Sequence, residues 1–322
     1  MIFSESLRMV LLLAAVSAAA FLMIAKAPID PLTSYIGADS TLSEEAKEEI
    51  AEYWGLNDPL PERFLTWASH AVKGDFGTSI VYKKPVLEVI STRFSYSFVL
   101  MLLAWILSGA LGFALGLVCG FYQGGIGDRV AKGICLVLKS SPTFWVGLLM
   151  LTVFSAQLGW FPAGMAVPAG KLASEVTLGD RLYHLALPVL TLTLVGMGDM
   201  ALYTRQKTVE IMNSDFILYA RARGETEGQI LGRHVLRNVA LPAVTVQFSS
   251  FSELFGGMAL AENVFSYPGI GTAVTAAALN GDAPLLMGIA LFSALFVFVG
   301  NLTANLLYGV FDLRVREDKD YA

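Results

Sequence analysis

Charged side chains are scarce in this sequence. Only 15% of its 322 residues are Asp, Glu, Lys or Arg, whereas 55% are hydrophobic, a balance far from that of a typical globular protein. Several uncharged runs reach about 20 residues, which is the length that a helix needs to cross the hydrocarbon core of a bilayer. The composition therefore predicts an integral membrane protein.

Histidine and cysteine are also rare. The three histidines, His70, His184 and His234, are scattered along the chain, and neither Cys119 nor Cys135 has a Cys or His neighbour at metal-ligand spacing. We interpret the cysteines as small buried apolar residues. The sequence predicts no metal site, and it disfavours a membrane-embedded enzyme because such an enzyme needs clustered nucleophiles, bases or metal ligands.

The phosphate-binding motif G-x-x-x-x-G-K-[ST] is missing as well. Without that loop the chain cannot bind ATP by this route. We therefore expect no catalytic residue and no cofactor in this chain. A net charge of −5 that is unevenly distributed gives no reason to expect a nucleic-acid partner.

The apolar runs predict an all-α protein with six transmembrane segments. The first resembles a signal peptide, since Arg8 precedes an apolar run and Ala25-Lys26-Ala27 resembles a cleavage site. Its run is longer than the apolar region usual in such peptides, so we interpret it as a spanning helix. The predicted segments are Leu7–Ala27, Phe94–Tyr122, Val130–Gln157, Leu185–Thr204, Leu241–Phe265 and Leu285–Phe311.

Lysine and arginine are concentrated in alternate connections. They occur at Arg129 and Lys132, throughout residues 205–240 and in the tail 312–322, whereas residues 266–284 contain none. Because cationic loops tend to remain in the cytoplasm, both termini are expected to be cytoplasmic. Residues 1–27 then form the first span, residues 28–93 an external insertion, and residues 94–311 a membrane core of five spans that includes the cytoplasmic loop 205–240.

The external insertion has the pattern of two short amphipathic helices. Thr41 with Glu44 predicts a capping box, and Gly55 is placed to end the first helix. A second helix follows Pro61. The residues predicted to share the apolar faces are Ile50, Tyr53 and Trp54 in the first helix and Phe64, Ala68 and Ala71 in the second.

The cytoplasmic segment Asn213–Pro242 predicts two short helices around a tight turn. Asn213 or Ser214 can cap the first helix, Gly224 supplies a left-handed residue at its end, and Thr226 with Gln229 forms a second capping box. The second helix is expected to reach about Asn238, with Pro242 in the first turn of the next span. Such an element can dock another protein, although a solvated basic loop has the same pattern.

This loop resembles the "EAA" coupling loop of ABC importer permeases, and specifically that of the peptide/nickel transporter family. The similarity rests on Ala220-Arg221-Ala222-Arg223-Gly224, followed by His234, Leu236-Arg237-Asn238 and Leu241-Pro242. Further motifs of that family occur in the same order along almost the whole chain. They are Pro28-Ile29-Asp30-Pro31, Gly55-Leu56 with Pro59-Leu60-Pro61, Gly74-Asp75-Phe76-Gly77-Thr78-Ser79, Glu262 to Gly271, and Asn301 to Arg316.

The resemblance implies a type I importer architecture in a bacterial inner membrane. It also implies four kinds of partner: a second, homologous permease subunit, two ABC ATPases that are identical or paired, an external solute-binding protein, and the lipid bilayer. The residues expected to couple to the ATPase are Tyr219, Ala220, Arg221, Ala222, Arg223, Gly224, Glu225, His234, Arg237, Asn238 and Pro242. Leu218 and Tyr219 depart from the family pattern, as do Ile29, Asn305 and Leu313, and the first two could set a preference for one ATPase.

Two carboxylates lie within apolar segments. Because ionisable groups at membrane depth usually face a cavity or a partner, Asp199 and Glu253 are candidates for the translocation path, although either could instead bond a neighbouring helix. A turn on the external side is expected to shape an outer gate. Its residues are Glu262, Phe265, Pro268, Gly269 and Gly271.

The expected function is that of an ATP-driven permease for small peptides or nickel chelates. Dipeptides, oligopeptides, nickel chelates and opine-like metallophores all remain open as solutes. The alternative is a secondary transporter or channel that works without an ATPase. That class would more naturally show halves related by internal repeats, and the sequence shows none.

Overall fold

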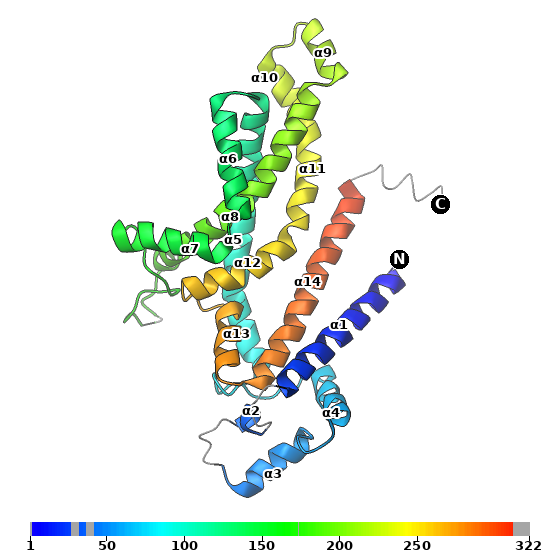
Figure 1. The fold of residues 1–322 in the computed structure, drawn as a ribbon, viewed down its shortest axis with the longest axis vertical. Helices are drawn as coiled ribbons and strands as arrows, with labels where there is room; N and C mark the ends of the chain where they lie inside the picture. Colours follow the sequence, from blue (N-terminus) through cyan, green and yellow to red (C-terminus); the bar gives the residue numbers. More distant parts are fainter. Residues whose placement is uncertain (1, 27–31, 37–41, 173, 312–322) are drawn as a thin grey trace. The chain divides into compact units, whose positions relative to one another are not determined.

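The computed structural model describes residues 2–26, 32–36, 42–172 and 174–311, and Figure 1 shows their helices. Apart from a single β-bridge between Thr78 and Pro85, the regular structure in these residues is helical. The chain divides into two compact units, one comprising residues 1–97 and 268–299 and the other residues 98–267 and 300–322. The motif at Pro28–Pro31, the predicted cap Thr41 and the tail 312–322 lie outside the described residues.

Four of the six predicted spans are continuous helices that are long and apolar enough to cross a membrane. All four helices begin before the predicted first residue, and α8 also continues past the predicted end at Thr204, whereas α1 and α5 end at Ala25 and Phe121, slightly before their predicted last residues. The longest two have 36 and 35 residues. The four helices are α1 (Ile2–Ala25), α5 (Val86–Phe121), α8 (Leu178–Met212) and α14 (Ala283–Phe311).

The third predicted span is divided and bent. Residues 130–157 belong to α6 (Ile126–Ser140), α7 (Thr143–Met150) and the π-helical η1 (Leu151–Gln157), and the chain turns by 112° between α6 and α7. The bend falls at Ser141-Pro142, where Ser141 is extended with ψ of 132°. A residue before proline is disfavoured in the helical region, and proline itself cannot donate a backbone hydrogen bond. The helix therefore ends there.

The fifth predicted span is also divided. It comprises α11 (Leu236–Ser249) and α12 (Phe251–Val264), each of 14 residues, with Ser250 between them. Figure 1 shows α12 turning away from the axis of α11. Neither helix alone has the roughly 20 residues that a bilayer requires.

In the first unit, α3 (Glu44–Tyr53) and α4 (Leu60–Val72) confirm the two helices predicted within residues 28–93; α2 (Thr33–Ile36) precedes them. The side chain of Ser43 caps α3 by accepting a bond of 3.3 Å from the Ala46 amide, a role that the sequence had assigned to Thr41. Gly55 ends α3 with φ of +58°, as predicted. Trp54 and Trp67 are buried with Phe21 of α1, whereas Tyr53 is exposed.

The Gly74-to-Ser79 motif folds as a turn with defined hydrogen bonds. Gly74 and Gly77 have φ of +85° and +79°, and Asp75 accepts a 2.9 Å bond from the Gly77 amide. Asp75 also accepts a 2.7 Å bond from the Tyr53 hydroxyl, which raises the pKa of Tyr53. The motif therefore ties α3 to the segment that leads into α5.

A buried carboxylate holds the other end of this motif. Asp282 is fully buried and accepts bonds of 2.6 Å from the Ser79 hydroxyl and 3.1 Å from the Val81 amide. Asp282 also caps α14 through the Leu285 amide at 3.1 Å. Around these bonds, the first turns of α5 and α14 pack against α13 (Ile270–Leu279) through Val86, Ile289 and Ala273.

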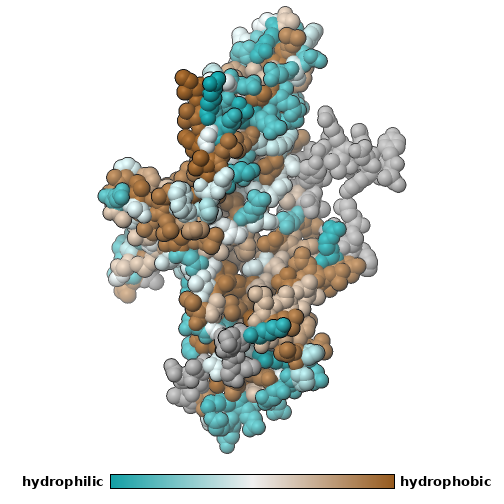
Figure 2. Space-filling model, viewed as in Figure 1, coloured by the Kyte–Doolittle hydropathy of each residue, from teal (hydrophilic) through white to brown (hydrophobic). Residues whose placement is uncertain are grey.

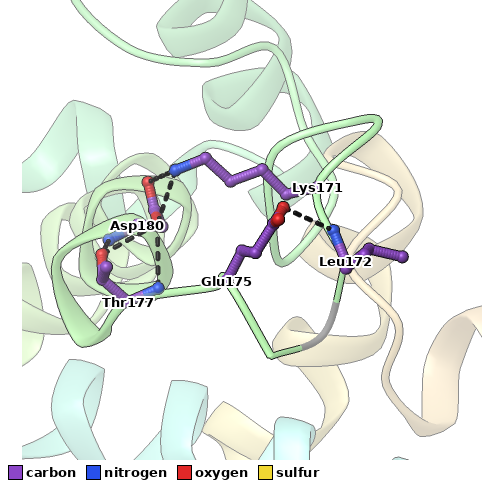
Figure 3. A network of polar contacts seen from close by, with 5 residues as sticks. All are labelled: Lys171, Leu172, Glu175, Thr177 and Asp180. Atoms are coloured by element: carbon purple, nitrogen blue, oxygen red, sulfur yellow. Dashed lines mark hydrogen bonds and ion pairs between the residues drawn. The ribbon is translucent and has the colours of Figure 1, made fainter.

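The connection before α8 ends in a polar network (Figure 3). Thr177 and Asp180 form a capping box, with Thr177 Oγ1 accepting from the Asp180 amide at 3.1 Å and Asp180 accepting from the Thr177 amide at 2.9 Å. Lys171 Nζ donates to both Asp180 oxygens at 3.0 and 2.9 Å. The side chain of Glu175 accepts from the Leu172 amide at 3.3 Å. These contacts fix where α8 begins.

Candidate functional site

The segment after α8 folds as the predicted helix–turn–helix. Helix α9 (Asp215–Ala222) is followed by Gly224, with φ of +84°, and then by α10 (Glu227–Ile230). The capping box at α10 is complete, because Thr226 Oγ1 accepts from the Gln229 amide and Gln229 Oε1 accepts from the Thr226 amide at 2.9 Å. Ser214 rather than Asn213 occupies the N-cap position of α9.

The prediction that the second helix ends near Asn238 is wrong. α10 continues through a π-helical turn, η2 (Leu231–Val235), directly into α11. Pro242 therefore lies inside α11 rather than in its first turn, so the Asn238 carbonyl loses its usual helical donor. The second helix of the loop is consequently continuous with the membrane helix that follows it.

Apolar packing holds α9 against the ends of the neighbouring helices. Ile217 is 0% exposed, and it packs in a cluster with Ala220 of α9, Ile211 of α8, Ile230 of α10 and Val239 of α11. The two buried residues of α9, Ile217 and Ala220, are three positions apart, which places them on one face of the helix. The position of α9 is thus coupled to that of α8 and α11.

The opposite face of α9 is apolar but exposed. Leu218 and Tyr219 are each 66% exposed, and Phe216 on the same helix is 45% exposed. Figure 2 shows hydrophilic residues gathered at the end that carries α9 and α10, with hydrophobic ones among them. Exposed apolar side chains on a polar, structured loop are typical of a docking surface.

An arginine–carboxylate ion pair and a histidine–carboxylate contact close the turn between α9 and α10. Arg221 donates two hydrogen bonds to Glu227, at 2.9 and 3.3 Å, and this contact raises the pKa of the Arg221 guanidinium. His234 Nε2 lies 2.9 Å from Glu225 Oε2, so this histidine joins η2 to the turn. Arg223 lies over the Tyr219 ring, with 5.9 Å between its Cζ and the ring centroid.

The predicted coupling residues thus separate into two groups. Residues 219–225 and His234 belong to the compact turn, whereas Arg237, Asn238 and Pro242 lie on α11 and line a cavity beside it. Sequence reasoning did not identify Ile217, Ile230 or Val239, which hold the loop in place. Their apolar character and helical spacing were the available signal.

The two carboxylates in the apolar segments line the same small cavity. Asp199 of α8 and Glu253 of α12 border a space of about 80 Å³ together with Thr143 and Ser250. Asp199 forms a close ion pair with Lys139 of α6, a partner that the sequence analysis did not name. Within the described residues, no cluster of three or more His, Cys, Asp or Glu side chains is arranged to hold a metal ion.

A second ion pair between α6 and α8 is more deeply buried. The Asp128 side chain is only 2% exposed and faces Arg205, which is 20% exposed. Arg205 Nη2 donates to Asp128 at 2.7 Å, Arg205 Nε makes a second close contact, and the Gly124 amide donates to Asp128 at 2.9 Å. This pair was also missed, because 77 residues separate its partners and no local pattern links them.

The predicted outer turn is tightly built. In its first half, Glu262 and Phe265 are buried, and their carbonyl groups accept bonds of 2.8 Å from the Tyr267 amide and 2.9 Å from the Met165 amide. In its second half, Pro268 and Gly269 precede α13, and Gly271 is buried within that helix. The boundary between the two units falls between Tyr267 and Pro268.

The buried ion pair gives a testable prediction for stability. Replacing Asp128 with Ala leaves the Arg205 guanidinium without its partner, so the free energy of unfolding should fall by about 3–5 kcal/mol. Removing both charges, with Asp128→Leu and Arg205→Met, should recover most of the loss. Thermal unfolding of the purified protein in detergent measures both effects.

Glu210→Ala is the matched control, since it breaks the exposed Lys207–Glu210 pair and should cost less than about 1 kcal/mol. An Asp128→Ala protein that unfolds at the same temperature as the control would show that the pair does not hold α6 to α8.

Comparison with known proteins supports the resemblance noted in the sequence. Residues 112–317 match the family described as "Binding-protein-dependent transport system inner membrane component". The chain is 34% identical to the oligopeptide transport system permease protein AppB of Bacillus subtilis (strain 168), over 98% of each chain. It is 32% identical to the glutathione transport system permease protein GsiC of Escherichia coli (strain K12), over 94% of each chain.

The fold also has a solved counterpart. A chain of the MetNI methionine ABC transporter, in an inward-facing conformation, is similar with a TM-score of 0.55 and 14% identity. The match covers 70% of this chain and 97% of that one, and it indicates the type I permease fold. Together with the family match over residues 112–317, these similarities show that the chain belongs to the family of ABC importer permease subunits, the inner membrane components of binding-protein-dependent transport systems.

Proposed function

We infer that this chain forms half of the translocation path of a bacterial ABC importer and that separate ATPases drive it through the loop 205–240. The partners in this proposal are a second, similar permease subunit, two ATPases that bind ATP and Mg, and an external binding protein that delivers the solute. The loop, both termini and therefore the ATPases lie on the cytoplasmic side, as the distribution of Lys and Arg predicts.

The proposal rests on the observation that helix α9 has one buried face and one exposed apolar face. One face, Ile217 and Ala220, is packed into the unit, while Leu218 and Tyr219 on the other are exposed. Leaving two large apolar side chains in water costs free energy that a partner's groove can recover. A displacement of α9 by a partner bound to its exposed face would also displace α8 and α11, because the buried face of α9 packs against them.

The solute that we propose is a small peptide. The names of the relatives supply the reason, since those at 34% and 32% identity are described as transporting oligopeptides and glutathione. Nickel chelates and opine-like metallophores stay a prediction of the sequence alone. A secondary transporter has no comparable support.

Within the path, we place Asp199 and Glu253 beside the solute. Asp199 lies 13 residues before the end of α8, about 20 Å along the helix, which is well inside the bilayer if that end is at the inner surface. The 80 Å³ cavity that the two carboxylates border would then widen into the path between the permease subunits. The turn that contains Glu262, Phe265, Pro268, Gly269 and Gly271 would shape the outer gate.

The exposed face of α9 can be tested by removing its apolar side chains. Leu218→Ser combined with Tyr219→Ser should reduce the amount of ATPase that co-purifies with a tagged permease at least tenfold, because the docking contact loses its apolar core. Leu172→Ser is the control, since Leu172 is 67% exposed on the connection predicted to be external. Unchanged ATPase recovery in the double variant would remove α9 as the docking helix.

The turn itself can be tested at Gly224. Its φ of +84° is costly for any residue with a Cβ, and most of all for a β-branched one. A Cβ at Gly224 would meet no atom within 4 Å, so Gly224→Val should distort the turn through backbone strain alone. We expect ATP hydrolysis to continue while peptide uptake per ATP falls several-fold.

Gly228→Val is the matched control, because Gly228 also has open space around it but lacks a positive φ. The measurement is the ratio of ATP hydrolysed to peptide accumulated in membrane vesicles. An equal ratio in the Gly224→Val, Gly228→Val and unmodified proteins would contradict a coupling role for this turn.

A further inference from the structure

A cavity of about 470 Å³ lies beside the docking loop, between α8 and α11. Lys207, on one wall, is five residues before the end of α8, and Arg237, on the other, is the second residue of α11. Lys207 is therefore about 8 Å from the end of α8, whereas Arg237 lies within the continuous helix formed by α10, η2 and α11. The lining of this cavity shares no residue with the one bordered by Asp199 and Glu253.

The polar part of this cavity carries positive charge. Lys207, Arg237, Tyr203 and Asn238 all line it, the Asn238 side-chain amide donates to the His234 carbonyl at 2.7 Å, and the lining contains no carboxylate. Lys207 pairs with the exposed Glu210 at 2.7 Å, but no ion pair joins Arg237 to a carboxylate of the residues that the structure describes. Among the residues that the structure describes, the Arg237 guanidinium has no hydrogen-bond partner, and a guanidinium suits a phosphate group, which accepts paired hydrogen bonds from it.

The remaining part of the lining is apolar. Phe216, Leu241 and Val246 contribute to it, so cationic and hydrophobic surfaces meet within one cavity. A ligand that satisfies both must have an anionic end and a hydrocarbon body. Anionic phospholipids have this structure, and they are abundant in the cytoplasmic leaflet, where basic pockets between membrane helices bind their headgroups.

We propose that the cavity between α8 and α11 is a phosphate-binding site, occupied by the headgroup of an anionic phospholipid. The site goes beyond the proposed function, and it rests on that proposal only for the placement of the end of α8 at the inner surface. A bound lipid would fill the space between the two helices against which α9 packs. It would thereby stiffen the base of the docking loop.

The test uses the intact transporter purified in detergent and titrated with dioleoylphosphatidylglycerol or with dioleoylphosphatidylcholine. Native mass spectrometry counts the retained lipids. Arg237→Gln should weaken retention of phosphatidylglycerol about tenfold or more, because it removes the charge-assisted hydrogen bonds to the phosphate. Lys207→Gln, on the facing helix, is a second variant and should show a smaller loss in the same direction.

Arg233→Gln is the matched control, since Arg233 is an exposed arginine of the same segment that does not line the cavity. Equal lipid retention in the Arg237→Gln and unmodified transporters would overturn the proposal, and so would an equal loss in Arg233→Gln. A separate titration with inorganic phosphate distinguishes the source: if Arg237→Gln loses phosphate but keeps phosphatidylglycerol, the site binds a free anion and the lipid assignment is wrong.

The amount of ATPase recovered with the unmodified chain is measured in the same preparations. A transporter that retains phosphatidylglycerol through Arg237 but carries no ATPase would count against the proposed function and not against the phosphate site.

Discussion

The packing of α9 against the ends of α8 and α11 is the contact on which the proposed mechanism depends. Ile217, Ala220 and Val239 are buried together, and α10 continues through η2 into α11 without a break. Because close-packed cores transmit displacement rather than absorb it, a partner that moves the exposed face of α9 also moves two membrane helices. A loop attached only by flexible chain could bind a partner but could not transmit its movement.

Sequence rules were reliable where the determinants are local. The turn at Gly224, the capping box of Thr226 and Gln229 and the end of α3 at Gly55 were all predicted, because each depends on residues a few positions apart. Long apolar runs likewise located four of the membrane helices. The structure also explains one residue of the Gly74-to-Ser79 family motif, because the Ser79 hydroxyl donates to the buried Asp282 carboxylate.

The remaining features depend on contacts between distant parts of the chain. Nothing near Asp128 indicates Arg205, and nothing near Asp199 indicates Lys139, yet both pairs join α6 to α8. Hydropathy alone also concealed two divisions within apolar runs. Pro142 was a usable signal for the first bend, whereas Ser250 follows no rule that would distinguish it from other polar residues in a span.

Reconstitution into lipid vesicles is the most direct test of whether an external motor moves this permease. Both permease subunits are inserted with a labelled dipeptide outside, and the ATPases, ATP and the binding protein are added in turn. We expect accumulation of the dipeptide only when all components are present. Accumulation by the permease subunits alone, with no ATPase and no ATP, would contradict the mechanism.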